Sequence, residues 1–219
     1  MLLLFDIDGT LITSGGAGEM ALRTAFAEVF HLPIDLELVP LAGRTDTGIT
    51  REMLALHRIP ITENNISTVL DCYLKHLPKQ LIAKKGLTLP GIRPLLDALH
   101  ALPHIVLGLL TGNLERGAKL KLQHHGLDSY FEFGAFADDH HDRNALGPIA
   151  LQRANSIHQT SFQPSSTFIL GDTPHDIACA RAFDAKVVAV ATGAFSTADL
   201  AQHSPDFLFE NFAELQNVL

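Results

Sequence analysis

The residues best suited to chemistry are two aspartates, Asp6 and Asp8, which close the first apolar run of the 219-residue chain. Side chains alternate faces along a strand, so the two carboxylates are expected on the same face. Two like charges so close together are costly unless a cation or a proton lies between them, and Mg²⁺ prefers oxygen ligands. The pair therefore predicts a divalent cation site at the carboxyl end of a strand. An Asx-type turn that uses only Asp8 and Gly9 is the structural alternative.

A hydroxyl, a glycine and an amide follow a second apolar run, at Thr111, Gly112 and Asn113. Free backbone N–H groups at the start of a helix bind anions, and the hydroxyl of Thr111 can donate one more hydrogen bond. The motif is therefore consistent with an anion site. A plain helix N-cap formed by Thr111 or Asn113 explains it about equally well.

Two further aspartates, Asp172 and Asp176, follow the apolar run that ends at Leu170. Pro174 suits the first turn of a helix, and an acidic Asp176 would stabilise the helix N-terminus, which is a structural explanation for that residue. It does not explain Asp172, which stands just beyond the strand as Asp6 does. Three strand ends would therefore bring four carboxylates and a hydroxyl to one rim.

So much negative charge also needs a fixed cation, and Arg143 is the candidate. Arginine stays charged and can grip a phosphate through two parallel N–H bonds. The structural alternative is a surface arginine that pairs with Asp139 or Asp142. No lysine between residues 131 and 170 competes for the role.

The elements that would position these residues alternate between strands and helices. Short, nearly continuous apolar runs predict strands at 2–7, 105–110, 131–136, 167–170 and 186–190, with a weaker one at 206–209. Amphipathic patterns predict helices near 92–99, 114–125 and 145–157. The alternation predicts an α/β fold with a doubly wound parallel sheet, in which ligands bind at the carboxyl ends of the strands.

Residues 14–86 break this rhythm, because they contain helical patterns but no convincing strand. Helices are expected around 22–30, 46–57 and 63–84. We therefore expect a core domain formed by 1–13 and 87–219 and an all-helical cap domain formed by 14–86. The segments 14–16 and 85–90 are plausible hinges, since glycine permits unusual backbone angles. The alternative, that these helices simply cover one sheet face, fits the length of the segment less well.

Composition narrows the classes of partner. The net charge of −8 disfavours non-specific binding to nucleic acid or to an anionic membrane. The apolar run at the N-terminus is interrupted at Asp6 and is too short for a signal peptide or a membrane span. Cys72 and Cys179 are the only cysteines and are expected to be reduced, as in the cytoplasm, although the sequence leaves a disulfide between them open.

Three motifs carry a resemblance to a known family. FDIDGTL, LLTGN and ILGDTPHD, in this order, resemble the first, second and fourth motifs of the haloacid dehalogenase superfamily. The helical insert after the first strand resembles the cap of its phosphoglycolate phosphatase-like branch. The resemblance implies a Rossmann-like core and a Mg²⁺-dependent phosphatase that acts on a small phosphorylated metabolite. It predicts no oligomeric state.

The resemblance also implies roles for individual residues. Asp6 would be the nucleophile that forms an aspartyl-phosphate, and Asp8 the general acid and then the general base. Asp6, Asp172 and the backbone carbonyl of Asp8 would hold Mg²⁺, with Asp176 as a further ligand or a support. The phosphoryl oxygens would be held by Thr111, the backbone around Gly112 and Asn113, and Arg143.

The third motif departs from the usual pattern of that branch. A lysine followed by proline is common there, whereas here Arg143 is the plausible match and Pro148 lies later. In the cap, Arg44 precedes an expected helix that Thr45 or Asp46 can cap. Arg44 would either reach the leaving group of the substrate or remain a solvated surface arginine, and the sequence favours neither.

Particular residues favour or disfavour the alternative functions. A sugar phosphomutase of the β-phosphoglucomutase type is the main alternative, but such enzymes tend to carry an acidic residue and a histidine early in the cap, where residues 11–16 offer neither. Asp8 argues against a dehalogenase or a phosphonate hydrolase, and the complete set of motif residues argues against a non-catalytic binding protein. The pairs His124-His125 and His140-His141 lack a cysteine cluster or an i, i+4 partner, so they predict no zinc site.

Overall fold

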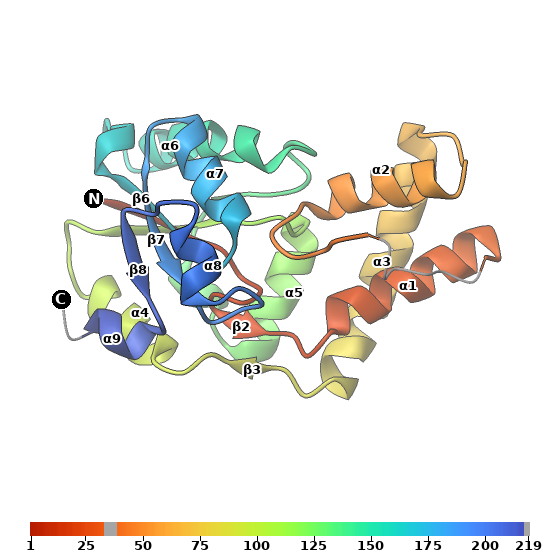
Figure 1. The fold of residues 1–219 in the computed structure, drawn as a ribbon, viewed down its shortest axis with the longest axis horizontal. Coiled ribbons are helices and arrows are strands. Elements are labelled where there is room, and N and C mark those ends of the chain that lie inside the picture. The colour runs from red at the N-terminus through yellow and green to blue at the C-terminus, as the bar shows by residue number, and fades with distance from the viewer. Residues whose placement is uncertain (33–38, 217–219) are drawn as a thin grey trace.

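The computed structural model describes residues 1–32 and 39–216. Within these residues six strands form one sheet in the order β5-β4-β1-β6-β7-β8, and each neighbouring pair is parallel (Figure 1). The strands are β1 (Leu2–Phe5), β4 (Val106–Leu110), β5 (Gly134–Ala135), β6 (Thr167–Gly171), β7 (Lys186–Val190) and β8 (Phe207–Phe209). The predicted α/β fold with a parallel sheet is confirmed.

Helices cover both faces of this sheet. Leu3 and Phe5 of β1 pack on one face with α4, α5 and α9, whereas Leu2 and Leu4 pack on the other face with α6, α7 and α8. A parallel strand that is buried on both faces needs an apolar side chain at every position, as β1 has. The helices are α4 (Ile92–His100), α5 (Glu115–His125), α6 (Leu146–Ile157), α7 (Pro174–Ala182), α8 (Thr197–Ala201) and α9 (Phe212–Gln216).

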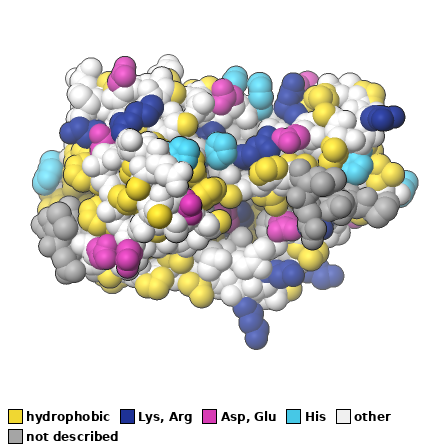
Figure 2. Space-filling model, in the orientation of Figure 1, with side chains coloured by type: hydrophobic (Ala, Val, Ile, Leu, Met, Phe, Trp, Pro, Cys, Tyr) yellow, Lys and Arg dark blue, Asp and Glu magenta, His cyan; other side chains and the backbone are white. Residues whose placement is uncertain are grey.

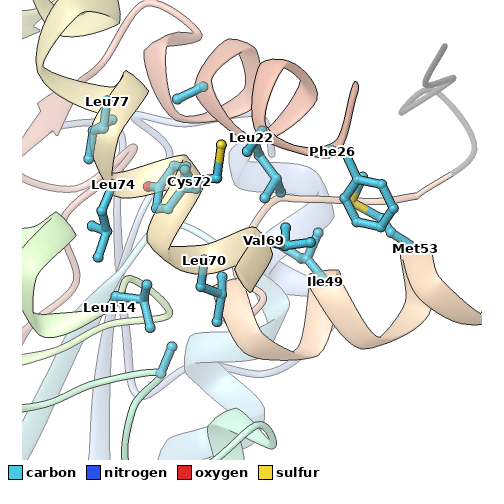
Figure 3. Close-up of a cluster of buried hydrophobic side chains, with 14 of the residues drawn as sticks. Leu22, Phe26, Ile49, Met53, Val69, Leu70, Cys72, Leu74, Leu77 and Leu114 are labelled. Atoms are coloured by element: carbon cyan, nitrogen blue, oxygen red, sulfur yellow. The ribbon is translucent and has the colours of Figure 1, made fainter. Parts of the chain in front are cut away.

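Three further helices lie beside the sheet, between β1 and β4 in the chain (Figure 1). They are α1 (Ala17–Phe30), α2 (Asp46–Leu56) and α3 (Glu63–Ala83). Each contributes to one apolar cluster, in which Phe26, Met53 and Leu77 are almost fully buried (Figure 3). Leu114, which directly precedes α5, belongs to the same cluster, so the inserted helices rest on the start of α5.

A short antiparallel pair that was not predicted connects the insert to the sheet. β2 (Ile12–Thr13) pairs with β3 (Leu87–Thr88), and the N–H of Leu89 donates to the carbonyl of Leu11 at 3.0 Å. β2 directly precedes the expected hinge segment 14–16, and β3 lies within the other, 85–90. A strand of two residues leaves no recognisable apolar pattern in the sequence. Its pairing also depends on segments that lie far apart in the chain.

Two of the predicted strands are shorter in the structure by two residues or more. The first ends at Phe5, because the N–H groups of Leu11 and Ile12 both donate to the carbonyl of Ile7 and close a tight turn. The strand expected at 131–136 contains only Gly134 and Ala135, since β5 lies at the sheet edge and pairs with β4 over just these residues.

The surface and the cysteines bear on the expected partners. On the face shown in Figure 2, acidic and basic side chains are interspersed among apolar ones. Among the helices described, none combines the length and apolarity that a bilayer crossing requires. Cys72 in α3 and Cys179 in α7 are buried free thiols, so the disulfide that the sequence left open is not formed.

Candidate active site

The end of β1 places Asp6 beside the end of β6. The N–H of Asp6 donates to the carbonyl of Leu170 at 2.9 Å, so Asp6 continues the sheet by one residue before the chain turns. Gly9 has a φ of 82° in this turn, and a Cβ there would overlap the carboxylate of Asp172. The backbone at Gly9 therefore lies directly against the carboxylate of Asp172, and glycine allows this approach because it has no side chain.

Three carboxylates meet at this rim. Oxygen atoms of Asp6, Asp172 and Asp176 all lie within 4.8 Å of one another, and all three residues are buried. Burial raises the pKa of Asp6 to about 6; the neighbouring Asp176 adds to the rise, whereas Arg143 opposes it. Burial, together with the charges of Asp176 and Asp6, also raises the pKa of Asp172 well above its ordinary value. The cluster therefore holds more negative charge than its own cation neutralises.

This cluster fits a hard divalent cation. Its donors are all carboxylate oxygens, the ligand type that Mg²⁺ prefers, and three carboxylates share the single guanidinium of Arg143. Asp172 also accepts a hydrogen bond from the hydroxyl of Thr10 at 2.9 Å, which fixes one of its oxygens. The residues present at the strand ends thus suit Mg²⁺.

Arg143 is buried at the centre of these charges. Its Nη2 donates to Oδ1 of Asp176 and lies 3.4 Å from Oδ1 of Asp6, and its Nη1 donates to the carbonyl of Gly43 at 3.0 Å. Burial alone would lower the pKa of Arg143, but the carboxylates of Asp176 and Asp6 outweigh it and raise the pKa above its ordinary value. Its Nε has no hydrogen-bond partner among the residues described.

The alternative of a surface ion pair for Arg143 is wrong. Asp139 pairs instead with Arg153, and the carboxylate of Asp142 accepts the N–H of Asn144. Arg143 follows Asp142 in a short 3-10 helix that leads into α6 and turns its side chain toward the strand ends. The structure therefore brings Arg143 to Asp6.

Asp176 is held by its own chain on both oxygens. Oδ2 accepts the N–H of Thr173 at 3.0 Å and the hydroxyl of Thr173 at 2.8 Å, while Oδ1 pairs with Arg143. This is the capping box at the start of α7, so the helix-start explanation of Asp176 is confirmed. Because both oxygens are engaged and the residue is fully buried, the geometry favours the supporting role over that of a ligand.

Thr111 and Asn113 join the end of β4 to both aspartates of the first motif. Thr111 opposes the rise in the pKa of Asp6, and its hydroxyl oxygen accepts from Nδ2 of Asn113 at 2.8 Å. The same Nδ2 donates to Oδ2 of Asp8 at 2.9 Å. The second motif therefore lies directly against the first, although Thr111 itself is fully buried behind the pocket.

A lysine that sequence reasoning missed completes the network. Nζ of Lys121 lies 2.5 Å from Oδ2 of Asp8 and donates to Oδ1 of Asn113 at 2.6 Å. Burial raises the pKa of Asp8, but Lys121 and Asn113 outweigh burial and hold that pKa below its ordinary value. The signal was available: Lys121 occupies the buried stripe of α5 with Ala118 and Leu122, where an unpaired lysine would be costly.

The site opens into a pocket of about 290 Å³ between the strand ends and the inserted helices. Asp6, Asp8, Asn113, Lys121, Arg143 and Asp172 line it from the core. The insert lines it with Glu19, Leu22, Arg44, Asp46, Ile49 and Tyr73. The insert therefore forms one wall of the pocket that contains the carboxylates.

The loop before α2 docks the insert on the core. The N–H of Asp46 donates to the carbonyl of Gly112 at 2.7 Å, and a Cβ on Gly112 would overlap the carbonyl of Arg44. A carboxylate oxygen of Asp46 accepts the N–H of Leu114 at 2.9 Å, and burial raises the pKa of Asp46 to about 6. Of the two expected caps for α2, Thr45 is the residue that caps it.

Arg44 lines the pocket, but its charge is engaged within the insert. Its Nη2 pairs with Glu52, and its Nη1 donates to the carbonyl of Pro40 at 3.3 Å. Arg44 matches neither expectation fully, because it lines the pocket while its guanidinium group pairs with Glu52 of α2.

Fold and site together define a class: an α/β protein whose candidate active site lies at the carboxyl ends of a parallel sheet, beneath inserted helices. The profile of the haloacid dehalogenase-like hydrolase family matches residues 3–190, so the chain belongs to this family. The resemblance drawn from the three motifs is confirmed.

Curated relatives of the chain are named phosphatases. It is 28% identical to the phosphoglycolate phosphatase of Chromobacterium violaceum, with 98% of this chain and 94% of the relative covered. It is 29% identical to the pyrophosphatase PpaX of Anoxybacillus flavithermus, with 99% and 95% covered. The chain is thus an enzyme of the phosphatase type within its family.

Solved structures show the same fold. A hydrolase from Pseudomonas syringae superposes with a TM-score of 0.76 at 19% identity, with 98% of this chain and 95% of that chain covered. At this identity the likeness concerns the fold alone.

Proposed function

We propose that this protein is a Mg²⁺-dependent phosphatase that hydrolyses a small phosphorylated metabolite through an aspartyl-phosphate on Asp6. The observation that carries the proposal is the meeting of Asp6, Asp172 and Arg143 in the buried lining of one pocket. Asp6 and Asp172, with the backbone carbonyl of Asp8, would hold Mg²⁺, which would supply positive charge to the phosphoryl group and to the carboxylates. Asp176 would support Arg143.

In the first step, a carboxylate oxygen of Asp6 attacks phosphorus and the bond from phosphorus to the ester oxygen breaks. Arg143 supplies fixed positive charge beside Asp6, which offsets the repulsion between a carboxylate and a phosphate. Thr111 would help to orient Asp6, and backbone groups of Gly112 and Asn113 would face the phosphoryl oxygens.

Asp8 would donate a proton to the leaving oxygen and then accept one from the water that attacks phosphorus. Such proton transfer is worth roughly 10²–10⁴-fold in rate. Lys121 and Asn113 hold Oδ2 of Asp8 in place and favour its carboxylate form, which is the form the second step needs. A bound phosphate adds negative charge beside Asp8 and raises its pKa, which favours proton uptake before the first step.

Residues 14–86 would act as a cap that closes over the substrate and selects it. The pocket of about 290 Å³ suits a small molecule, since it lies at the lower end of the usual range for ligand sites. Closure would exclude water from the first step, and reopening would release the product. The two buried free thiols suit a reducing compartment such as the cytoplasm.

One observation keeps the phosphomutase alternative in view. Glu19, in the first turn of α1, lines the pocket, so an acidic group does stand early in the insert. No histidine accompanies it between residues 14 and 30, which favours hydrolysis over transfer back to a sugar. The two functions differ in their product.

The test is a screen of phosphorylated metabolites with Mg²⁺, in which release of inorganic phosphate is measured and Asp6→Asn is the blank. Phosphate release that depends on Asp6 and stops in a chelator supports the proposal. An isomerised sugar phosphate without phosphate release would establish the mutase instead. Release that persists in Asp6→Asn would show that another residue is the nucleophile.

A further inference from the structure

A second cluster of metal-binding side chains lies in the inserted helices, away from the phosphate site. It consists of Glu28 from α1 and of Cys72 and His76 from α3. One ligand atom from each residue lies within 4.8 Å of the other two. Nε2 of His76 is 2.7 Å from Oε2 of Glu28, and His76 and then Cys72 hold the pKa of the Glu28 carboxyl below its ordinary value. Neither the proposed reaction nor the pocket uses these residues.

The backbone places the three groups for a common ligand. Cys72 and His76 are one helical turn apart, so their side chains share one face of α3. α1 packs along this helix in one apolar cluster, to which Ala25, Phe26 and Cys72 belong, and this packing brings Glu28 opposite that face. The adjacent Tyr73 lines the substrate pocket, so consecutive positions on α3 serve different surfaces.

The donor set is characteristic of a zinc-type ion. A thiolate, an imidazole nitrogen and a carboxylate oxygen are the ligands that Zn²⁺ selects, whereas Mg²⁺ avoids sulfur. Tetrahedral bonds of about 2.0–2.3 Å would separate the ligand atoms by roughly 3.3–3.7 Å. The three atoms already lie within 4.8 Å, and only the His76–Glu28 pair would have to open, by under about 1 Å, from its 2.7 Å hydrogen bond.

Exposure allows an ion to enter without unfolding. The Cys72 residue is 4% exposed, whereas the side chains of His76 and Glu28 are 26% and 60% exposed. A buried sulfur beneath two partly open ligands leaves a fourth position that faces solvent. The adjacent histidine pairs differ: among the residues described, neither contributes to a group of three candidate ligands.

We propose that Glu28, Cys72 and His76 form an accessory site for a thiophilic divalent cation of the Zn²⁺ type. The bound ion would fasten α1 to α3. Both helices also line the substrate pocket, α1 through Glu19 and Leu22 and α3 through Tyr73. The ion would therefore stabilise the walls of the pocket that the insert supplies, without touching the phosphate.

The test is a Co²⁺ titration of the full chain in excess Mg²⁺, which occupies the carboxylates at the strand ends. Cobalt bound to a thiolate absorbs in the near ultraviolet, so the band reports sulfur ligation directly. We expect it to saturate at one equivalent in the wild type and in Cys179→Ala, which removes the only other cysteine. It should vanish in Cys72→Ser. Zn²⁺ should displace Co²⁺ and raise the Tm of the wild type but not of Cys72→Ser.

His76→Gln tests the site at a partly exposed position, where folding is not at risk. Loss of this ligand should weaken Co²⁺ binding by at least about tenfold, as should Glu28→Gln. His124→Asn is the matched histidine control and should bind as the wild type does. The proposal is overturned if no band saturates at one equivalent, if the band survives in Cys72→Ser, or if His76→Gln binds Co²⁺ as tightly as the wild type.

Discussion

The charged side chains compared here are buried at the strand ends and partly exposed in the inserted helices. At the strand ends, the side chains of Asp6, Arg143 and Asp176 are at most 6% exposed, and partners from several elements hold each of them. In the insert, Arg44 pairs with Glu52 at 26% and 43% exposure, above an apolar cluster that stabilises the helices without help from charge.

The difference in burial suits the two regions to different tasks: the strand ends to the reaction, and the insert to the choice of substrate. Buried charges lose hydration and are tolerated only where their geometry is fixed, which is what a reacting centre requires. Partly exposed pairs contribute little stability and can be exchanged without loss of the fold. The strand ends therefore suit a fixed reaction, while the insert is free to vary the walls of the pocket.

The largest expected effect is the loss of the nucleophile. Asp6→Asn should lower kcat by at least about 10³-fold on the best substrate of the screen, because removal of a covalent nucleophile leaves only binding and charge stabilisation. Asp206→Asn, at a carboxylate that pairs with Arg181 and directly precedes β8, should keep its activity. A kcat within tenfold of wild type for Asp6→Asn would contradict the assignment.

The next effect is on stability. Arg143→Met leaves the buried carboxylates of Asp6 and Asp176 without their cation, so the free energy of unfolding in urea should fall by roughly 3–5 kcal/mol. Arg181→Met removes an exposed pair with Asp206 and should cost at most about 1 kcal/mol. Equal losses of unfolding free energy in the two variants would mean that removing the buried cation costs no more stability than breaking an exposed pair.

A pH effect follows from the raised pKa of Asp6. The pKa is about 6 in the fold against an ordinary value of 3.8, so the fold favours protonated Asp6. This contribution to stability is full below pH 3.8 and is lost as the pH rises through about 6. In a chelator, the Tm should therefore fall between about pH 4 and pH 6, and less steeply in Asp6→Asn. Mg²⁺ should flatten the wild-type profile; an identical slope in Asp6→Asn would assign the effect elsewhere.

The smallest effect is expected in the insert. Arg44→Gln removes a partly exposed pair with Glu52, so the free energy of unfolding should change by less than about 1 kcal/mol. If Arg44 contacts the leaving group, KM should rise with kcat nearly constant, and Glu52→Gln should not reproduce that rise. A large fall in kcat in Arg44→Gln would contradict the assignment of the reaction to the strand ends and of substrate selection to the insert.

Sequence reasoning reached the strand ends because local patterns specify them. β7 and its neighbours are continuous apolar runs, and Asp6 and Asp172 stand directly after such runs. The pairing of β2 with β3 could not be predicted, since it depends on contacts across the whole insert. Lys121 lies outside the motifs at the strand ends, because it reaches Asp8 from the buried face of a helix. The site at Glu28, Cys72 and His76 needs the packing of two helices, which spacing along one of them does not reveal.

The most direct test of the central claim is a crystal structure of the protein with Mg²⁺ and beryllium fluoride, which mimics a phosphoryl group on a carboxylate. We predict that beryllium is bonded to a carboxylate oxygen of Asp6, beside Arg143, with Mg²⁺ ligated by Asp6 and Asp172. An adduct on any other residue, or Mg²⁺ bound away from both aspartates, would contradict the account.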